Sequence, residues 1–392
     1  MSPAGSRLRF APPRISATPE LCWVLARAFA APDRVVPGPM NPQRGISLAM
    51  DLDLLGRIAS RIPAAQLAEE VGTPGKQAAI AERHRVAAST LRILRTAGRV
   101  ADTAAMTGIP VAFLKGAALH LSGQALVSAR GASDVDVLVP AGRAADLQQA
   151  LLARGFRPRG ATRSPHHLAP LGQQADPWVE LHLEVPGVTV PGSPGPMTFD
   201  ALAANDLLLP LATQPGRAWV PASAILAAHA LVHGIDDHGF GADRYPLMRM
   251  PCDIADIVAA TPLGPSIAER VQRFVGDGVR DVEMRAAFSL VDRLLRGDLS
   301  LVCDPSPAGR LLSHLLAGAV DPDYRDALRL RQIAFLLRHG SLALLGHKLG
   351  QRLDVLSPRA GPDRMWKAVL MLARMVRAEI RVRASARPRP PR

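Results

Sequence analysis

The sequence predicts an α+β protein in which a small mixed β-sheet lies between an N-terminal and a C-terminal helical region. Three short apolar runs with the branching or alternation of strands occur near the middle of the chain, at 109–114, 132–139 and 178–185. Before and after them, apolar side chains recur at helical spacing. A chain of 392 residues, 48% of them hydrophobic, is long enough to bury a sizeable core.

The region before the strands is expected to be helical. Apolar side chains follow helical spacing from Ile46 to Ile62. Thr73-Pro74-Gly75 predicts a turn, and Ala78–Met106 then forms one long predicted helix that ends at Gly108.

The central stretch alternates predicted strands with predicted helices. Trp178–Val185 is the clearest strand, because its apolar side chains face one way while Glu180, His182 and Glu184 face the other. The two strands before it are expected at Ile109–Leu114 and Ala132–Val139, and helices at Ala117–Val127 and Arg143–Arg154.

The chain turns helical again after a Pro/Gly-rich linker at 186–196. The predicted helices are Ala222–Gly234, Leu247–Ala260, Ile267–Val275, Val279–Leu295, Ala308–Leu316, Tyr324–Leu337 and Met365–Ser385. The expected organisation is a flexible leader at 1–45, a helical region at 46–107, a core at 108–190, a second helical region at 197–345, and a basic helix and tail at 346–392.

Composition narrows the class of protein. The net charge of +13 indicates either a solvated basic surface or an anionic partner such as a nucleotide, RNA or acidic lipid. Aromatic residues make up only 4% of the chain, which argues against stacking platforms for single-stranded nucleic acid. The three cysteines are isolated, no secretory signal is evident and no apolar run reaches the length of a membrane span, so we expect a cytoplasmic protein.

Two carboxylates stand in the second predicted strand. Asp134 and Asp136 lie two residues apart within an apolar run, so their side chains point to the same face. Such a pair is costly unless a cation lies between the two groups, and Mg²⁺ is the oxygen-seeking ion that suits it. The simpler alternative is a pair of solvent-exposed carboxylates at a strand end.

Glu180 adds a third carboxylate on the acidic face of the third strand. Three carboxylates that converge on one face can hold two Mg²⁺ ions, which activate an attacking oxygen and neutralise a triphosphate leaving group.

The order of these features resembles the nucleotidyltransferase superfamily of the polymerase-beta type, and within it the bacterial uncharacterised nucleotidyltransferase family with a Leu-Lys-Gly signature. The resemblance covers most of residues 50–260. The matching residues are Gly108-Ile109-Pro110-Val111, Leu114-Lys115-Gly116-Ala117-Ala118-Leu119, Arg130, Ser133-Asp134-Val135-Asp136, Gly155-Phe156, Glu180-Leu181-His182, His229, His233 and Asp253-Ile254-Ala255.

The resemblance implies that 108–190 is a nucleotidyltransferase core. Asp134, Asp136 and Glu180 would be the catalytic metal ligands for two Mg²⁺ ions, with Glu180 standing where superfamily members often have Asp. Asp176 and Glu184 are fallback candidates for the third carboxylate.

The nucleotide-binding residues implied by the resemblance are Lys115, Gly116, Arg130 and Ser133. Gly116 would let the backbone approach a phosphate at a helix N-terminus. Ala117 replaces the usual serine there, and Lys115 would supply charge instead. An exposed turn lysine and an ion-paired arginine are the simpler alternatives for Lys115 and Arg130.

Several histidines form a separate candidate group. His229, His233, Asp236, Asp237, His238 and Asp253 lack a His-Glu-x-x-His zinc signature, so packing or lining a substrate pocket is favoured over binding a metal. His166 and His167 are expected in a loop that could line an acceptor site. His182 shares the face of Glu180 and is expected to orient it or to bond within the sheet.

The predicted function is a Mg²⁺-dependent nucleotidyltransferase that binds a nucleoside triphosphate such as ATP. It would move the nucleoside monophosphate to an acceptor hydroxyl or phosphate and release pyrophosphate. The alternatives are a toxin-like enzyme that modifies tRNA and a non-catalytic nucleotide-binding pseudoenzyme. The acceptor, a small molecule, protein or RNA, is not specified by the sequence, and the basic tail is expected to be solvated or to contact a membrane surface or RNA.

Overall fold

A computed structural model describes residues 15–159, 166–173, 176–193, 195–211, 218–237, 248–261, 267–276, 281–328, 330, 373–378 and 380–381. Residues 1–14 of the predicted leader and most of the predicted basic helix and tail therefore lie outside the described residues. Residues 373–378 and 380–381 are helical.

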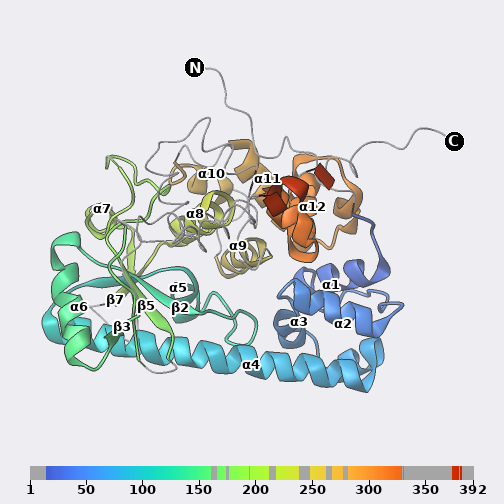
Figure 1. The fold of residues 1–392 in the computed structure, drawn as a ribbon, viewed down its shortest axis with the longest axis horizontal. Coiled ribbons are helices and arrows are strands. Elements are labelled where there is room, and N and C mark those ends of the chain that lie inside the picture. Colours follow the sequence, from blue (N-terminus) through green and yellow to red (C-terminus); the bar gives the residue numbers. More distant parts are fainter. Residues whose placement is uncertain are drawn as a thin grey trace, which may run out of the picture.

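A seven-stranded mixed sheet forms the core, with helices on either side of it in sequence and in space (Figure 1). This confirms the predicted α+β fold class. The strand order is β3-β4-β5-β2-β1-β7-β6. The strands are β1 (Val111–Phe113), β2 (Asp134–Leu138), β3 (Arg157–Pro158), β4 (Leu171–Gly172), β5 (Trp178–His182), β6 (Leu208–Pro210) and β7 (Ala218–Pro221).

The centre of the sheet joins the three predicted strands. β2 runs parallel to β5 and antiparallel to β1. The backbone N–H of Leu114, just after β1, donates to the carbonyl of Asp136 (3.0 Å). The end of β1, and with it the start of helix α5 (Lys115–Leu121), is thereby held beside the middle of β2.

Three strands of the sheet, β4, β6 and β7, have no counterpart among the sequence predictions, whereas β3 begins just after Phe156, from which a weaker strand is expected. β7 pairs in parallel with β1 and antiparallel with β6. These last two each have four residues or fewer and contain a proline, Pro210 in β6 and Pro221 in β7. Strands this short carry too few residues to show a period of two, and proline weakens the strand signal further.

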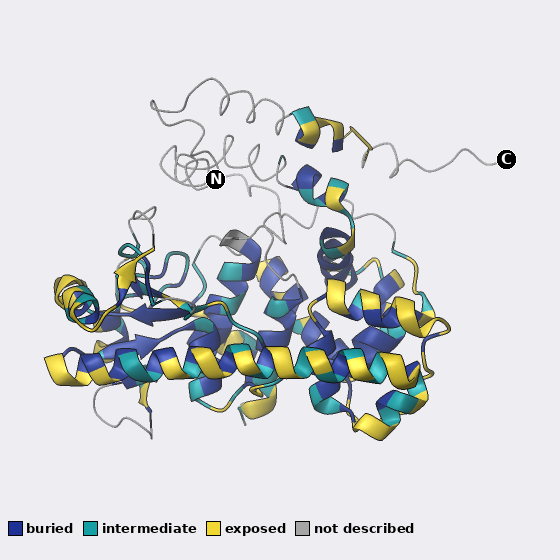
Figure 2. Cartoon of the chain, turned by 60° about the horizontal axis from the view of Figure 1, so that its bottom comes forward, coloured by how far each residue is buried: buried dark blue, intermediate teal, exposed yellow. Residues whose placement is uncertain are grey.

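A long helix joins the N-terminal region to the sheet. α4 (Ala64–Thr107) contacts α2 (Pro42–Asp51) and α3 (Leu55–Arg61) along one part of its length, and α5, α6 (Ala144–Ala153) and the central strands along the other. In Figure 1 it runs beneath both groups of elements, and Figure 2 shows that it buries one side and exposes the other.

The predicted turn in this helix is a kink. Gly72 has φ +71° and ψ 174°, a conformation that breaks the helix and that residues with a Cβ rarely adopt. Pro74 follows at the start of the second segment, where a missing backbone N–H is tolerated. The helix then continues to Thr107, immediately before Gly108.

Part of the predicted leader packs into the core. Pro19–Phe29 forms helix α1, in which Trp23 and Phe29 are almost fully buried. The indole N–H of Trp23 donates to Glu70 of α4 (2.7 Å), and Arg27 forms a buried ion pair with the same carboxylate. Residues 19–29 thus belong to the N-terminal helical region.

Five helices after the sheet lie close to their predicted positions: α8 (Ser223–Val232), α9 (Arg249–Ala260), α10 (Ile267–Gln272), α11 (Asp281–Leu295) and α12 (Pro307–Val320). The π-helix η3 (His233–Asp237) extends α8, whereas α7 (Phe199–Ala204) and the 3₁₀ turns η2 (Ala141–Arg143) and η5 (Leu299–Cys303) have no counterpart among the predictions. Most of the predicted helix Tyr324–Leu337 lies outside the described residues. Within the described ranges, none of the helices combines the length and the apolarity that crossing a bilayer requires.

The burial of α1 generates a first prediction. Trp23→Ala is expected to lower the free energy of unfolding by about 3–5 kcal/mol in urea denaturation, because it removes a buried ring and leaves Glu70 with one donor fewer. Val35, which follows α1 and is 93% exposed, supplies the control. Val35→Ala is expected to change the free energy of unfolding little. Equal unfolding midpoints for the two variants would contradict the packing of α1.

Candidate functional site

The carboxylates of the site come from two neighbouring parallel strands. The pairing of β2 with β5 places Asp136 directly beside Glu180 and Asp134 beside Trp178. Residues in register on parallel strands project to the same face, so Asp134, Asp136 and Glu180 share one face of the sheet. Asp136 is 1% exposed, whereas Asp134 and Glu180 are half-buried.

His182 connects two of these carboxylates. Its Nε2 lies 2.8 Å from Oδ1 of Asp136 and 3.7 Å from Oε2 of Glu180. Ligand atoms of Asp136, Glu180 and His182 all lie within 4.8 Å of one another. Two carboxylates and an imidazole at this separation are a donor set that fits a divalent cation. Asp134, two residues before Asp136 on β2, does not belong to this group of three.

Lys115 extends into the same cluster. Its Nζ lies 2.9 Å from Oδ1 of Asp136, and its side chain is 21% exposed. Burial opposes the charge on the ammonium, but the carboxylates of Asp136, Asp134 and Glu180 outweigh burial and raise the pKa of Lys115 above its ordinary value. Lys115 therefore stays protonated and compensates part of the negative charge. It is the first residue of α5, where the sequence predicts a turn.

The two aspartates respond to this environment in opposite directions. Burial and the neighbouring Asp136 raise the pKa of Asp134 to about 6. Burial also acts against the charge on Asp136, but Lys115 and the hydrogen bond from His182 hold the pKa of that carboxyl well below its usual range. Asp136 is thus the firmly ionised member of the pair.

Gly116 and Arg130 pack against each other in a way that the sequence does not reveal. A Cβ at Gly116 would lie 2.0 Å from Nη1 of Arg130, so a larger residue there would require the guanidinium to move. The guanidinium of Arg130 is buried and donates to both oxygens of Asp253 in α9 (2.6 and 2.9 Å). The structure thus gives Arg130 a carboxylate partner in the C-terminal helical region, and nucleotide binding by Arg130 stays a prediction.

The remaining predicted residues lie around the cluster. Ser133 is exposed and immediately precedes β2. Asp176, a fallback carboxylate, forms ion pairs with Arg95 and Arg99 of α4. The other fallback, Glu184, lies 2.5 Å from Nδ1 of His166.

Two of the predicted histidines, His229 and His233, lie on helices close enough to the cluster for its charges to act on His229. His229 is buried on α8, and burial together with the charge of Lys115 holds its pKa well below the ordinary value, so the ring is neutral. Its ring meets that of His233 edge to face, with centroids 6.1 Å apart. Packing or lining a substrate pocket stays a prediction for these histidines, and His238 lies outside the described residues. The ring of His167 lies at an angle of 55° to that of His182, with ring centroids 5.5 Å apart.

Arg249, at the start of α9, is a site residue that sequence reasoning missed. It donates to Asp53 (3.3 Å), and its positive charge acts to lower the pKa of Asp134. Nothing in its local sequence distinguishes Arg249 from the other arginines of this Arg-rich chain, because its approach to β2 depends on how α9 packs.

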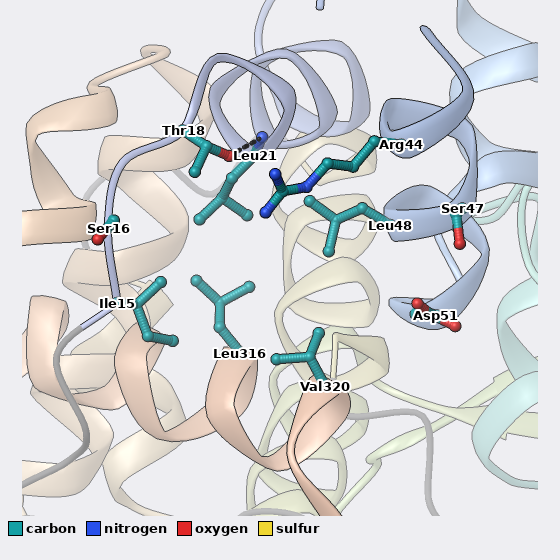
Figure 3. A pocket seen from close by; sticks show the side chains of 10 residues that line it. All are labelled: Ile15, Ser16, Thr18, Leu21, Arg44, Ser47, Leu48, Asp51, Leu316 and Val320. Atoms are coloured by element: carbon teal, nitrogen blue, oxygen red, sulfur yellow. Dashed lines mark hydrogen bonds between the residues drawn. The ribbon is translucent and has the colours of Figure 1, made fainter. Parts of the chain in front are cut away.

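A separate cavity of about 380 Å³ lies between residues 15–21, α2 and α12 (Figure 3). Leu21, Leu48 and Leu316 contribute apolar walls, and the side chain of Arg44 extends between Leu21 and Leu48. The lining includes none of the predicted site residues.

Comparison with known proteins gives one match. The family model described as uncharacterised nucleotidyltransferase matches residues 38–273, more than half of the chain. The match covers the carboxylate cluster, Lys115 and the Arg130–Asp253 pair, and it ends within the C-terminal helical region. Neither the curated proteins nor the solved structures contain a significant match.

The contact between Gly116 and Arg130 is open to a matched test. Gly116→Ala is expected to lower the free energy of unfolding by about 2–4 kcal/mol, because the new methyl group displaces a buried guanidinium from Asp253. Gly98→Ala, also in a helix, has open space around its Cβ and is expected to gain about 0.5–1 kcal/mol. Denaturation curves that move in the same direction for both variants would contradict this packing.

The raised pKa of Asp134 predicts a pH-dependent stability. In metal-free protein, Asp134→Asn is expected to raise the free energy of unfolding by about 1–2 kcal/mol at pH 8, because it removes a carboxylate whose ionisation folding disfavours. With the pKa at about 6 in the folded protein and 3.8 as the ordinary value, the gain falls to about half at pH 5 and vanishes below the ordinary value.

The control for this experiment is Asp146→Asn, which alters an exposed carboxylate and is expected to change stability little at any pH. Urea denaturation in the presence of a chelator measures both variants. A gain for Asp134→Asn that does not depend on pH would show that ionisation of Asp134 is not its source.

Proposed function

The chain belongs to the uncharacterised nucleotidyltransferase family, and from this premise we propose that it is a Mg²⁺-dependent nucleotidyltransferase. The reaction joins the nucleoside monophosphate part of a nucleoside triphosphate such as ATP to an acceptor hydroxyl or phosphate. The bond between the α- and β-phosphates breaks, pyrophosphate leaves, and the acceptor oxygen loses its proton.

The register of β2 with β5 is the observation that carries this proposal. Asp136 and Glu180 are neighbours across a parallel strand pair, and Asp134 precedes Asp136 on the same face. Folding spends free energy on the carboxylate of Asp134, because burial and repulsion by Asp136 oppose its ionisation. A cluster of this kind is useful when a cation and a polyphosphate bind to it.

Asp134, Asp136 and Glu180 would hold the divalent ion, with His182 fixing the orientation of Asp136. A bound Mg²⁺ supplies charge for a triphosphate and lowers the pKa of a coordinated oxygen. The sheet would fix the positions of the three carboxylates, and the ammonium of Lys115 would neutralise part of their negative charge. Preorganised charges of this kind lower the barrier without reorganisation during the reaction.

The nucleotide would bind at the edge of the cluster formed by Lys115, Gly116 and Ser133. Ser133 is exposed there, whereas Gly116 is buried and the guanidinium of Arg130 takes the place of its Cβ, so Gly116 would offer only its backbone. Arg130 would position the first turn of α5 and would not contact the nucleotide itself, because it pairs with Asp253 and packs against Gly116. A reducing cytoplasm, where the free Cys22, Cys252 and Cys303 remain thiols, is the proposed location.

The test is transfer of label from each α-³²P nucleoside triphosphate to pools of small molecules, protein and bulk tRNA. The variant with both Asp134→Ala and Asp136→Ala is expected to lose activity about 1,000-fold or more, equivalent to roughly 4 kcal/mol of transition-state stabilisation. Asp146→Ala, an exposed carboxylate outside the cluster, is expected to keep wild-type activity.

The outcomes separate the alternatives. Transfer that survives in the double variant would refute the mechanism. Nucleotide binding by calorimetry without transfer to any pool would indicate a pseudoenzyme, which Ala117 in place of the superfamily serine allows. Label on tRNA, with RNA binding that falls steeply with salt, would identify a tRNA-modifying enzyme.

A further inference from the structure

We propose that Lys115 permanently occupies one of two cation positions at the carboxylate cluster, so that the cluster takes a single divalent ion where the sequence pattern predicts two. The inference rests on the proposed function and concerns how this chain's own residues complete the site. Three observations support it: a shared oxygen, the balance of charge and the backbone at Lys115.

The first observation is how the oxygens of Asp136 are used. Oδ1 receives both Nζ of Lys115 (2.9 Å) and Nε2 of His182 (2.8 Å). Paired catalytic ions lie about 3.5–4 Å apart, close enough for one carboxylate to bridge them through its two oxygens. Because an ammonium and an imidazole already surround Oδ1, Asp136 has only its other oxygen to offer an ion.

The second observation is the charge of the cluster. Asp134, Asp136 and Glu180 carry three negative charges, and the ammonium of Lys115 interacts electrostatically with all three groups. One positive charge leaves a net charge of two negative, which a single divalent ion neutralises. Before a nucleotide binds, a second divalent ion would leave the side chains and ions together with a net charge of two positive and would repel the ammonium.

The third observation is the backbone of Lys115. Its φ is +47°, in the left-handed region that residues with a Cβ seldom adopt. The hydrogen bond from Leu114 to the carbonyl of Asp136 holds the chain in place just before this residue. The side chain is directed to Asp136 and is largely buried, whereas a turn lysine ordinarily keeps its ammonium in water. A disfavoured conformation that delivers a charge to a functional cluster indicates a constrained role.

The experiment counts Mn²⁺ ions bound to the full-length chain by electron paramagnetic resonance, which measures the free ion during a titration. It is done without nucleotide, because a free nucleoside triphosphate would itself bind Mn²⁺ and obscure the number of ions held by the protein. Wild-type protein is expected to saturate at one Mn²⁺ per chain. Lys115→Ala, which opens the cation position, is expected to saturate at two.

Lys76→Ala is the matched control, because it removes the same charge from α4 outside the cluster and is expected to bind one ion. Thermal unfolding confirms that each variant is folded. The wild-type count decides the proposal even if Lys115→Ala does not fold.

Two results would overturn the role of Lys115. Wild-type protein that binds two Mn²⁺ ions per chain would show that the lysine leaves room for both. One ion in folded Lys115→Ala would show that the lysine does not occupy a cation position. Wild-type protein that binds no Mn²⁺ in this titration, and no α,β-methylene nucleoside triphosphate in a separate calorimetric titration, would instead refute the proposed function.

Discussion

The parallel pairing of β2 with β5 is the constraint on which the site depends. It fixes Asp136 beside Glu180 and brings His182, two residues further along β5, within hydrogen-bond distance of Asp136. A shift of this register by one residue would turn Glu180 and His182 to the opposite face and separate them from Asp136. The apolar neighbours Val135, Val137 and Leu181 are fully buried, so the core specifies the same register that the carboxylates need.

Charge compensation is the second constraint, and it extends beyond the sheet. The ammonium of Lys115 offsets the carboxylates directly, from a backbone conformation that the fold has to hold in place. Behind it, Arg130 and Asp253 form a buried pair that joins the approach to β2 with helix α9. A buried charge without its partner is strongly destabilising, so the pair also couples the C-terminal helical region to the geometry of the core. Gly116 makes this possible because it leaves room for the guanidinium.

The N-terminal helices contribute by holding α4 against the sheet. α4 contacts α2 and α3 on one part of its length and the sheet on the other, so the helical region and the core share one continuous set of buried side chains. Helix α1 joins the same set through Trp23, Arg27 and Glu70. The site therefore lies on a sheet that is supported by both flanking regions. Arg249 of α9 donates a hydrogen bond to Asp53, and its positive charge acts on Asp134.

The sequence by itself determined the fold class, the long helix before the sheet and the shared face of Asp134 and Asp136, because these follow from periods of 3.6 and 2 within short windows. The order of motifs also indicated the family. Only the tertiary structure decided which distant groups meet: β7 beside β1, Asp253 on Arg130, and both Lys115 and His182 on one oxygen of Asp136. The physical reason is that periodicity specifies which face a side chain takes, whereas partners far apart in sequence are chosen by strand order and helix packing, which leave no local pattern.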